Sequence, residues 1–465
     1  MSNQKFTALL MFAMAFVGSC AFSAEPEKTS PEKLQAFRDK VKHIVVIYQE
    51  NWSFDGLYGK FPGANGIANA SKESVAQTDR RGKKYDVLPQ PMDTEWKPSI
   101  PDRRFPGDLP VQPFDLNKYI AVEGKSPDLI HRFHPEQFQI HGGKMDRFVA
   151  WSDAGGLVMS YCDATDLPEG KLAQEFTLCD NFFHGAFGGS FLNHIWLVAA
   201  ATPMWPEAPK EIRIRKNEAN YADGVVTEDD HCVNTVFSVN KPRPKGMNKK
   251  ELLLPNLKLP TIGDRLTDKN NIDWAWFSGG WNRALAGEAE TNAEFAKLFQ
   301  FHHQPFVYFE RYADGTDAKK QHLKDEQDFL AALKTDSFPA VSFIKPYGID
   351  NEHPGYAELR RGQQHVAMLV ESVRSSPYWK DTVIIITYDE NGGRWDHVAP
   401  PKVDEWGPGT RVPTIVVSPF ARKNHVDHTQ YETSAILKLI ENRFELEPLS
   451  DRDRNAGDLL NALSF

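Results

Sequence analysis

Residues 383–393, VIIITYDENGG, indicate the kind of fold that this chain forms. The first six of them are β-branched or aromatic, which suits a strand that is buried on both faces of a parallel sheet. The polar DENGG that follows marks the end of that strand. Residues 43–51, HIVVIYQEN, have the same arrangement, and further apolar runs lie at 272–277, 340–344 and 412–418.

Helical periodicity separates several of these runs. The apolar residues of 366–373 and of 436–440 recur with the spacing of one helix face. Strands that alternate with helices predict an α/β fold with a central, mostly parallel sheet flanked by helices. We expect residues 25–465 to form a single domain, in which residues 203–260, rich in Pro, Lys and Glu, are an insertion or cap.

The composition excludes several classes of protein. Of the 465 residues, 41% are hydrophobic and 25% are charged, which is unlike a disordered, collagen-like or coiled-coil chain. The 54 Lys and Arg residues against 63 Asp and Glu residues leave a net charge of −9. Because binding to a phosphate backbone needs a basic surface, we expect no nucleic-acid partner.

The N-terminus has the pattern of an export signal. Lys5 is followed by an apolar stretch at residues 6–17 and by small residues up to Ala24, as is typical of a secretory signal peptide. We expect residues 1–24 to be removed and the protein to be periplasmic or secreted. No other window reaches the roughly 18 apolar residues that are needed to span a bilayer.

The cysteines leave two questions open. The sequence VGSC at 17–20 also resembles a lipoprotein box, in which Cys20 would carry a lipid anchor to the outer membrane. In an oxidising compartment, the three remaining cysteines allow one disulfide and one free thiol. These cysteines are Cys162, Cys179 and Cys232.

Oxygen-bearing side chains directly follow two of the apolar runs. Glu50 and Asn51 follow the first run, and Asp389 and Glu390 follow the run that opens at residue 383. In open α/β sheets, ligands bind at the carboxyl ends of the strands. Three carboxylates at one edge repel one another unless a cation neutralises them, and oxygen ligands favour a hard divalent ion such as Mg, Ca or Mn. The alternative is that these residues are only solvated turns.

Ser190 is the candidate nucleophile. It follows Gly188 and Gly189 and precedes an apolar, helix-compatible stretch at 191–201. Ser190 would therefore lie at a helix N-terminus, where free N–H groups and the helix dipole attract an anion such as phosphate. The alternative is that Ser190 only caps the helix, because Ser is a favoured N-cap residue.

Several of the 15 histidines lie in loops next to Gly or Pro. Histidine can donate hydrogen bonds to phosphate oxygens, protonate a leaving group or bind a metal. For each of them, the alternative is a structural role. The histidines that we single out are His131, His302, His303 and His353.

Seven motifs, in order along the chain, resemble the bacterial phosphoesterase family. This family unites secreted acid phosphatases of the acid phosphatase A type with phospholipases C, which are distant relatives of alkaline phosphatase. The motif FQFHHQPF and the chain length are closer to the acid phosphatase branch. The motifs are HIVVIYQENWSFDGLYG (43–59), HRFHPEQFQIHGGKMDRF (131–148), FTLCDNFFHGAFGGSFLNH (176–194), FQFHHQPF (299–306), NEHPGY (351–356), TVIIITYDENGGRWDHVAPP (382–401) and HTQYETSAILKLIENRF (428–444).

The resemblance implies a three-layer, alkaline-phosphatase-like fold and a role for individual residues. Ser190 falls on the family's nucleophile, which also contacts the metal. His131, His303 and His353 match histidines that surround the phosphoryl group, with His302 beside them. We also expect Asn193 to contact the substrate. The positions that match the family's ligands for one divalent metal are Glu50, Asn51, Ser190, Asp389 and Glu390.

We therefore expect a metal-dependent acid phosphatase that hydrolyses small phosphate monoesters through a phosphoserine. His353 would protonate the leaving alcohol, and cationic histidines in place of a second metal would favour activity at acid pH. The alternative enzyme is a phospholipase C that cleaves the phosphodiester of phosphatidylcholine, which needs aromatic faces for the choline group. In the first motif, Trp52 stands where the resemblance leads us to expect a basic residue, and we expect this difference to affect the choice of substrate. A third interpretation is a non-catalytic binding module.

Overall fold

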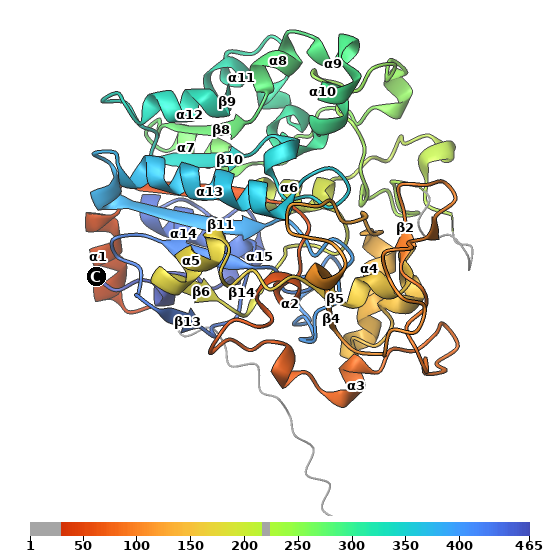
Figure 1. The fold of residues 1–465 in the computed structure, drawn as a ribbon. Coiled ribbons are helices and arrows are strands. Elements are labelled where there is room, and N and C mark those ends of the chain that lie inside the picture. Colours follow the sequence, from red (N-terminus) through yellow and green to blue (C-terminus); the bar gives the residue numbers. More distant parts are fainter. Residues whose placement is uncertain (1–28, 216–223) are drawn as a thin grey trace, which may run out of the picture.

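The computed structural model describes residues 29–215 and 224–465. The predicted signal peptide and Cys20 lie outside these residues. The chain folds around one large sheet with helices packed against it (Figure 1). Helix α1 lies beside the C-terminus, where the rings of Phe37 and Phe465 are 5.9 Å apart.

The central sheet confirms the predicted α/β fold with a mostly parallel sheet. Its strand order is β13-β6-β12-β11-β1-β10-β8-β9, and the four central parallel strands β11, β1, β10 and β8 coincide with predicted apolar runs. Every residue of β11 is buried, as its sequence requires. The strands are β1 (His43–Gln49), β6 (Thr177–Cys179), β8 (Trp274–Ser278), β9 (Leu323–Asp325), β10 (Val341–Lys345), β11 (Thr382–Tyr388), β12 (Thr414–Val417) and β13 (His425–Asp427).

One strand departs from the parallel arrangement. Strand β12 corresponds to the predicted run at 412–418, but it is antiparallel to both β11 and β6. The edge strands β9 and β13, and β6 next to β13, have three residues each, which is too short to give a periodic signal in the sequence.

Helices cover both faces of the sheet. Helices α5 and α13 pack together on one face, and α14 packs with α1, α6 and α15 on the other (Figure 1). The helices are α1 (Pro31–Lys40), α2 (Phe54–Tyr58), α3 (Lys72–Val75), α4 (Phe133–Ile140), α5 (Pro168–Glu175), α6 (Ser190–Ala199), α7 (Ile262–Asp268), α8 (Trp281–Leu285), α9 (Glu288–Thr291), α10 (Ala293–Leu298), α11 (Asp317–His322), α12 (Glu326–Ala332), α13 (Leu359–Arg374), α14 (Ser434–Phe444) and α15 (Asp451–Asn455).

Both helices predicted from apolar spacing are present as α13 and α14. Val366, Leu369, Val370 and Val373 are all buried on α13, which confirms the predicted apolar face. Three pairs of very short strands lie outside the main sheet. They are β2 (Met92–Asp93) with β3 (Ile100–Pro101), β4 (Phe114–Asp115) with β5 (Ser160–Tyr161), and β7 (Phe182–Phe183) with β14 (Tyr431–Glu432).

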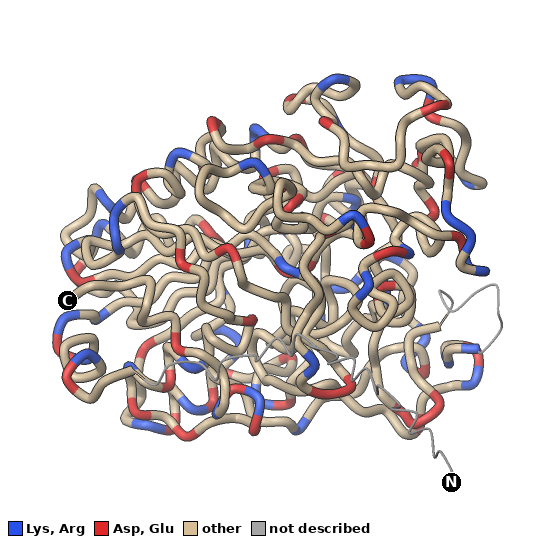
Figure 2. Tube along the Cα trace, turned by 90° about the horizontal axis from the view of Figure 1, so that it is seen from below, with Lys and Arg blue, Asp and Glu red and all other residues tan. Residues whose placement is uncertain are grey.

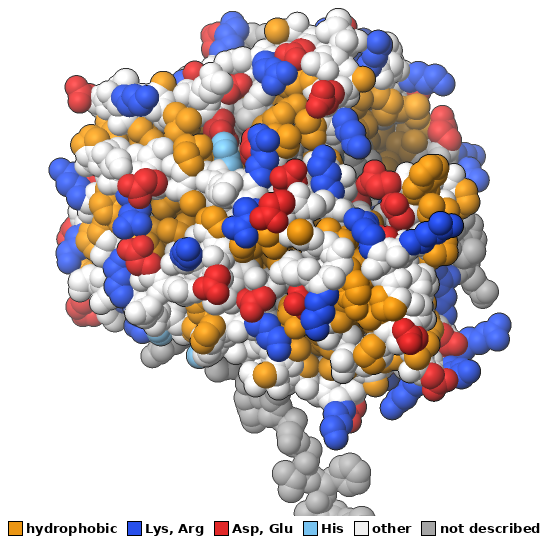
Figure 3. Space-filling model, viewed as in Figure 1, with side chains coloured by type: hydrophobic (Ala, Val, Ile, Leu, Met, Phe, Trp, Pro, Cys, Tyr) orange, Lys and Arg blue, Asp and Glu red, His pale blue; other side chains and the backbone are white. Residues whose placement is uncertain are grey.

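Cys162, Cys179 and Cys232 are separate buried thiols in the structure, so none of the three is in the disulfide that the sequence allowed. Among the described residues, no helix is both long and apolar enough to cross a membrane. Basic and acidic residues are interspersed along the chain (Figure 2). The face in Figure 3 likewise shows charges of both signs between small hydrophobic patches.

Candidate active site

A cavity of about 630 Å³ is lined by the predicted nucleophile and by the four predicted histidines. Its wall brings together Ser190, His302 and His303 with His131 and His353 from distant parts of the chain. The described residues of the predicted insertion also contribute to the wall. The lining residues are Thr94, Glu95, Lys97, Asp128, Leu129, Ile130, His131, Arg132, Asp153, Gly189, Ser190, Gly224, Val225, Asn234, Thr235, Lys297, Gln300, His302, His303, His353 and Tyr356.

The two central strands β1 and β11 place the predicted metal ligands next to each other. The strands are parallel and in register up to their last residues, so the residues that follow them leave the sheet at the same edge. The backbone N–H of Asn51 donates to Asp389 Oδ1 at 3.2 Å, and Asn51 adopts a φ of 64°. Glu50, Asn51, Asp389 and Glu390 all have 0% exposure.

The chemistry of these four side chains fits a hard divalent cation. Asn51 Oδ1, Asp389 Oδ2 and Glu390 Oε1 are buried without a hydrogen-bond partner among the described residues. Burial, and next the charge of Asp389, raise the pKa of both Glu50 and Glu390 well above the usual value. A bound cation would pair these oxygens and offset the repulsion between the carboxylates.

Lys345 is a charged residue of this site that our sequence analysis missed. It is the last residue of β10, next to β1, and its side chain is 1% exposed. Its ammonium forms an ion pair with Glu50 Oε1 and donates to the carbonyl of Tyr48 at 2.9 Å. The signal was available, because Lys345 directly follows the apolar run at 340–344 just as Glu50 follows the run at 43–48.

Ser190 is the first residue of α6, and its side chain does not cap the helix. The N-cap residue is Gly189, whereas the Ser190 hydroxyl donates to Glu50 Oε2 at 3.2 Å. This contact argues against the capping alternative. Gly189 lets the turn approach His131 closely, since a Cβ atom at Gly189 would lie 2.9 Å from the carbonyl oxygen of His131.

The structure places Asn193 differently from our prediction. Asn193 is fully buried and does not line the cavity. Its amide donates to the carbonyls of Ala186, Gly188 and Gly189 at 3.0 to 3.2 Å, and its Oδ1 accepts from the N–H of Ala186 at 2.9 Å. Because its polar atoms bond to the turn that carries Ser190, Asn193 holds this turn rather than the substrate.

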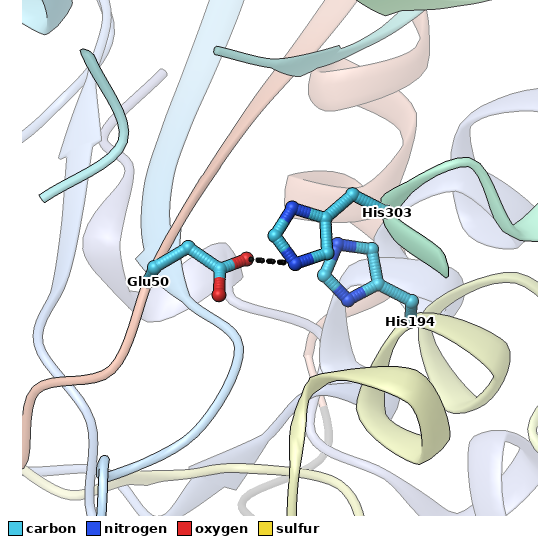
Figure 4. A group of neighbouring side chains, drawn as sticks. All are labelled: Glu50, His194 and His303. Carbon is cyan, nitrogen blue, oxygen red and sulfur yellow. Dashed lines mark ion pairs between the residues drawn. The ribbon is translucent and has the colours of Figure 1, made fainter. Parts of the chain in front are cut away.

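Glu50, His194 and His303 form one group whose candidate ligand atoms all lie within 4.8 Å of one another (Figure 4). His303 Nε2 is 3.3 Å from Glu50 Oε1. The rings of His194 and His303 stack with centroids 4.9 Å apart. His194 was not predicted, because it lies inside an apolar helix where only its spacing of four residues from Ser190 sets it apart.

His131 and His353 form a second group, together with Asp128. In both rings Nδ1 faces a main-chain carbonyl, that of Leu129 for His131 and that of Pro354 for His353. These contacts assign the proton to Nδ1 and make Nε2 the acceptor atom of each ring. The two Nε2 atoms lie 3.3 and 3.1 Å from Nδ2 of Asn51, so both rings face the same point of the site.

Burial disfavours the cationic form of three histidines of the site, which is opposite to our expectation of cationic rings. Burial lowers the pKa of His302 to about 3, and the pKa of His353 is lowered for the same reason. Burial and the nearby Lys345 lower the pKa of His303 well below the usual value. An acid pH optimum therefore does not follow from these rings alone.

The fold and the cavity define an α/β enzyme with a serine, carboxylates and histidines at the carboxyl ends of its central strands. The Phosphoesterase family model matches residues 41–447, and the chain belongs to this family. It is a hydrolase that acts on phosphoric ester bonds. The predicted family is thereby confirmed.

Named relatives match most of the chain at low identity. Phospholipase C A of Mycobacterium tuberculosis is 23% identical over 91% of this chain and 77% of the relative. The non-hemolytic phospholipase C of Pseudomonas aeruginosa is 23% identical over 91% of this chain, which spans only 57% of that relative. Among solved structures, a protein in the alkaline phosphatase superfamily from Vibrio parahaemolyticus has a TM-score of 0.34 and 10% identity, covering 64% of both chains.

Proposed function

We propose that Ser190 attacks the phosphorus atom of a phosphoester and forms a phosphoserine that water then hydrolyses. The observation that carries this proposal is the 3.2 Å hydrogen bond from Ser190 Oγ to Glu50 Oε2 at the wall of the cavity. Glu50 accepts the proton of Ser190 as the new P–O bond forms. The free N–H groups at the start of α6 stabilise the charge on the phosphoryl oxygens.

The leaving alcohol needs a proton when the old P–O bond breaks. We assign this proton to His353 Nε2, because the Nδ1 atom of this ring already faces the carbonyl of Pro354. Although burial favours the neutral ring in the free enzyme, the negative charge of a bound phosphoester favours the protonated one. His131 and His303 contact the phosphoryl oxygens from either side.

A single divalent cation completes the proposed site. The residues that would hold it are Glu50, Asn51, Ser190, Asp389 and Glu390. When bound, such a cation lowers the pKa of the serine hydroxyl and stabilises negative charge on phosphorus-bound oxygens.

The names of the relatives support a phospholipid phosphodiester as the substrate class better than they support the monoester of an acid phosphatase. We therefore place phospholipase C activity first. A phosphate monoester is the second candidate, and one observation favours it. Among the described residues that line the cavity, Tyr356 is the only aromatic one besides histidine, and its ring stacks on His353 at 4.4 Å. This wall contains no aromatic cage for a quaternary ammonium group.

The test compares both substrate classes with one pair of variants. Purified wild type, Ser190→Ala and Ser434→Ala are given an aryl phosphate and phosphatidylcholine vesicles between pH 5 and 9. Ser434 is the matched control, because it is a buried serine at the first position of another helix, α14. We expect Ser190→Ala alone to lose turnover, by at least about 1,000-fold.

Each outcome has a defined meaning. Preferential release of phosphocholine assigns a phospholipase C, and preferential release of phosphate from the aryl ester assigns a phosphomonoesterase. Activity of Ser190→Ala close to that of wild type would remove Ser190 as the nucleophile. Turnover of neither substrate class would favour the binding-module interpretation.

A further inference from the structure

The carboxylate of Glu352 joins three chain segments directly beneath the proposed site. Gln49 Nε2 donates to Glu352 Oε1 at 2.9 Å, and Tyr388 Oη donates to Glu352 Oε2 at 2.8 Å. All three side chains are essentially without solvent exposure. Each of them directly precedes a residue with an assigned role: Gln49 precedes Glu50, Glu352 precedes His353, and Tyr388 precedes Asp389.

The backbone at Glu352 is held in an unusual conformation. Glu352 has a φ of 72°, a left-handed value that non-glycine residues rarely adopt. Its carbonyl accepts a hydrogen bond from Trp52 Nε1 at 3.2 Å. Gly362 of α13 leaves room for the side chain, since a Cβ atom there would lie 2.2 Å from Cγ of Glu352. The surrounding contacts therefore fix both the position of Glu352 and the direction in which the chain continues to His353.

A second buried carboxyl group lies next to Glu352. Glu169 Oε2 is 3.1 Å from Tyr388 Oη, and this hydroxyl has only one proton to donate. If both carboxyl groups were charged, they would repel each other in this buried site, because the one proton of Tyr388 can bond to only one of them. Burial and the neighbouring Glu352 raise the pKa of Glu169 well above the usual value. Burial also raises the pKa of Glu352, but its hydrogen bonds with Glu169, Tyr388 and Gln49 oppose this shift. A proton held by the pair therefore belongs to Glu169, and the Glu352 carboxylate is the acceptor.

We propose that Glu352 is a positioning residue that aims the His353 imidazole at the leaving group by binding Gln49 and Tyr388 through its carboxylate. This inference rests on the proposed role of His353 as the acid. Glu352 itself does not line the main cavity and contacts no reacting atom. Its effect is to fix the loop that begins at Asn351 relative to the ends of β1 and β11.

The proposal predicts a loss of rate that depends on the leaving group. An alcohol with a low pKa leaves without a proton, whereas one with a high pKa needs the acid. We therefore compare kcat and KM of Glu352→Gln for 2,4-dinitrophenyl phosphate and for phenyl phosphate, or for the matching aryl phosphocholines if only diesters are cleaved. We expect kcat to fall about 100-fold for the phenyl ester and less than about threefold for the dinitrophenyl ester.

Two variants make the result interpretable. Glu169→Gln places an uncharged group of the same shape where a protonated carboxyl stands, so its kcat should stay within about threefold of wild type for both esters. His353→Ala should show the same dependence on the leaving group as Glu352→Gln. If Glu352→Gln does not fold, Tyr388→Phe is the substitute, because it removes one hydrogen bond to Glu352 without added bulk. The same kinetic comparison is then made with Tyr388→Phe, and its bound metal is measured in parallel.

The outcomes separate the positioning role from the proposed function. The positioning role would be overturned if kcat of Glu352→Gln fell equally for both esters, or if Glu169→Gln showed the same loss of kcat. His353→Ala would still lose more rate with the phenyl ester in that case. If His353→Ala shows no dependence on the leaving group, the assignment of the acid fails, and the positioning role fails with it. If Glu352→Gln and His353→Ala, but not Glu169→Gln, lose more rate with the phenyl ester than with the dinitrophenyl ester, the result supports both the acid role of His353 and the positioning role of Glu352.

Discussion

Ser190 Oγ lies 3.2 Å from Glu50 Oε2, although 140 residues separate them in the chain. This hydrogen bond connects the N-terminus of α6 to the carboxyl end of β1. It gives the Ser190 hydroxyl a carboxylate acceptor in place of the capping contact that serine usually makes at a helix start. The relationship depends on the close approach of the glycine turn, and this turn gives the first prediction.

Gly189→Ala should lower activity and also cost some stability, because the new Cβ would press against a backbone atom. The φ of Gly189 is −94°, which alanine tolerates, but the new Cβ would lie 2.9 Å from the His131 carbonyl and 3.3 Å from its ring. We expect kcat to fall by about 10- to 100-fold, because a small displacement of reacting groups is costly. The control is Gly107→Ala, whose Cβ meets only the side chain of Gln90. If kcat of Gly189→Ala equalled that of wild type, the close contact between Gly189 and His131 would not matter for activity.

Asp389→Ala should lose metal and activity together. Removal of one oxygen ligand from a buried site weakens divalent cation binding, so metal content by mass spectrometry should fall with turnover. Asp381→Ala is the control, because Asp381 lies at the other end of β11 and pairs with Lys42 at 3.3 Å. Full activity of Asp389→Ala without bound metal would contradict the site.

Lys345→Met should destabilise the protein more without metal than with it. Loss of the ammonium leaves Glu50 buried without its cationic partner, which typically costs about 3 to 5 kcal/mol. A divalent cation at Glu50 would offset part of this cost. Chemical unfolding with EDTA and with added metal measures the difference.

Lys319→Met provides the comparison for this measurement. Lys319 is also largely buried and is paired with Asp314, outside the cavity. Its destabilisation should be the same with and without metal. If Lys345→Met destabilised the protein equally with and without metal, the cation would not bind near Glu50.

Glu441→Gln should make the protein more stable at alkaline pH. Burial, and next the neighbouring carboxylate of Asp453, raise the pKa of Glu441 to about 9. An acid with a raised pKa in the folded state stabilises the fold fully below about pH 4.5, its unfolded value, and this contribution is lost as the pH rises to about 9. The loss approaches about 1.4 kcal/mol per pH unit in that range.

The measurement is the free energy of unfolding of wild type and Glu441→Gln between pH 4.5 and 9. The advantage of the variant should grow with pH. Glu371→Gln on α13 is the control, since that side chain is 66% exposed. A constant difference between wild type and Glu441→Gln across this range would contradict the raised pKa.

The centre of the fold could be predicted from the sequence because its strands are long and rich in β-branched residues. The runs that became β1, β10 and β11 lie in the interior of the sheet, where burial on both faces leaves a continuous apolar pattern. The direction of β12 could not be predicted, because an apolar run has the same composition in either orientation. The short strands at the edges could not be predicted, because three residues are too few to show a hydrophobic period.

The place of a residue at the candidate site was predictable wherever it ends or directly follows a central strand. Glu50 and Asp389 lie together as this rule predicts, and Lys345 obeys it as well. His194 and Glu352 could not be found in this way, because their roles depend on contacts between segments that are far apart in sequence. The side chain of Asn193 faces the turn instead of the cavity, which its position near Ser190 does not reveal.

The cavity wall and the strand ends come from different parts of the chain. The wall includes residues of two segments that are not part of the central sheet, whereas Glu50 and Asp389 directly follow its two middle strands. The wall residues of these segments are Thr94, Glu95, Lys97, Gly224, Val225, Asn234 and Thr235. If Ser190 is the nucleophile, as proposed, redesign of these peripheral segments should change which phosphoester is accepted while the reaction at Ser190 stays the same.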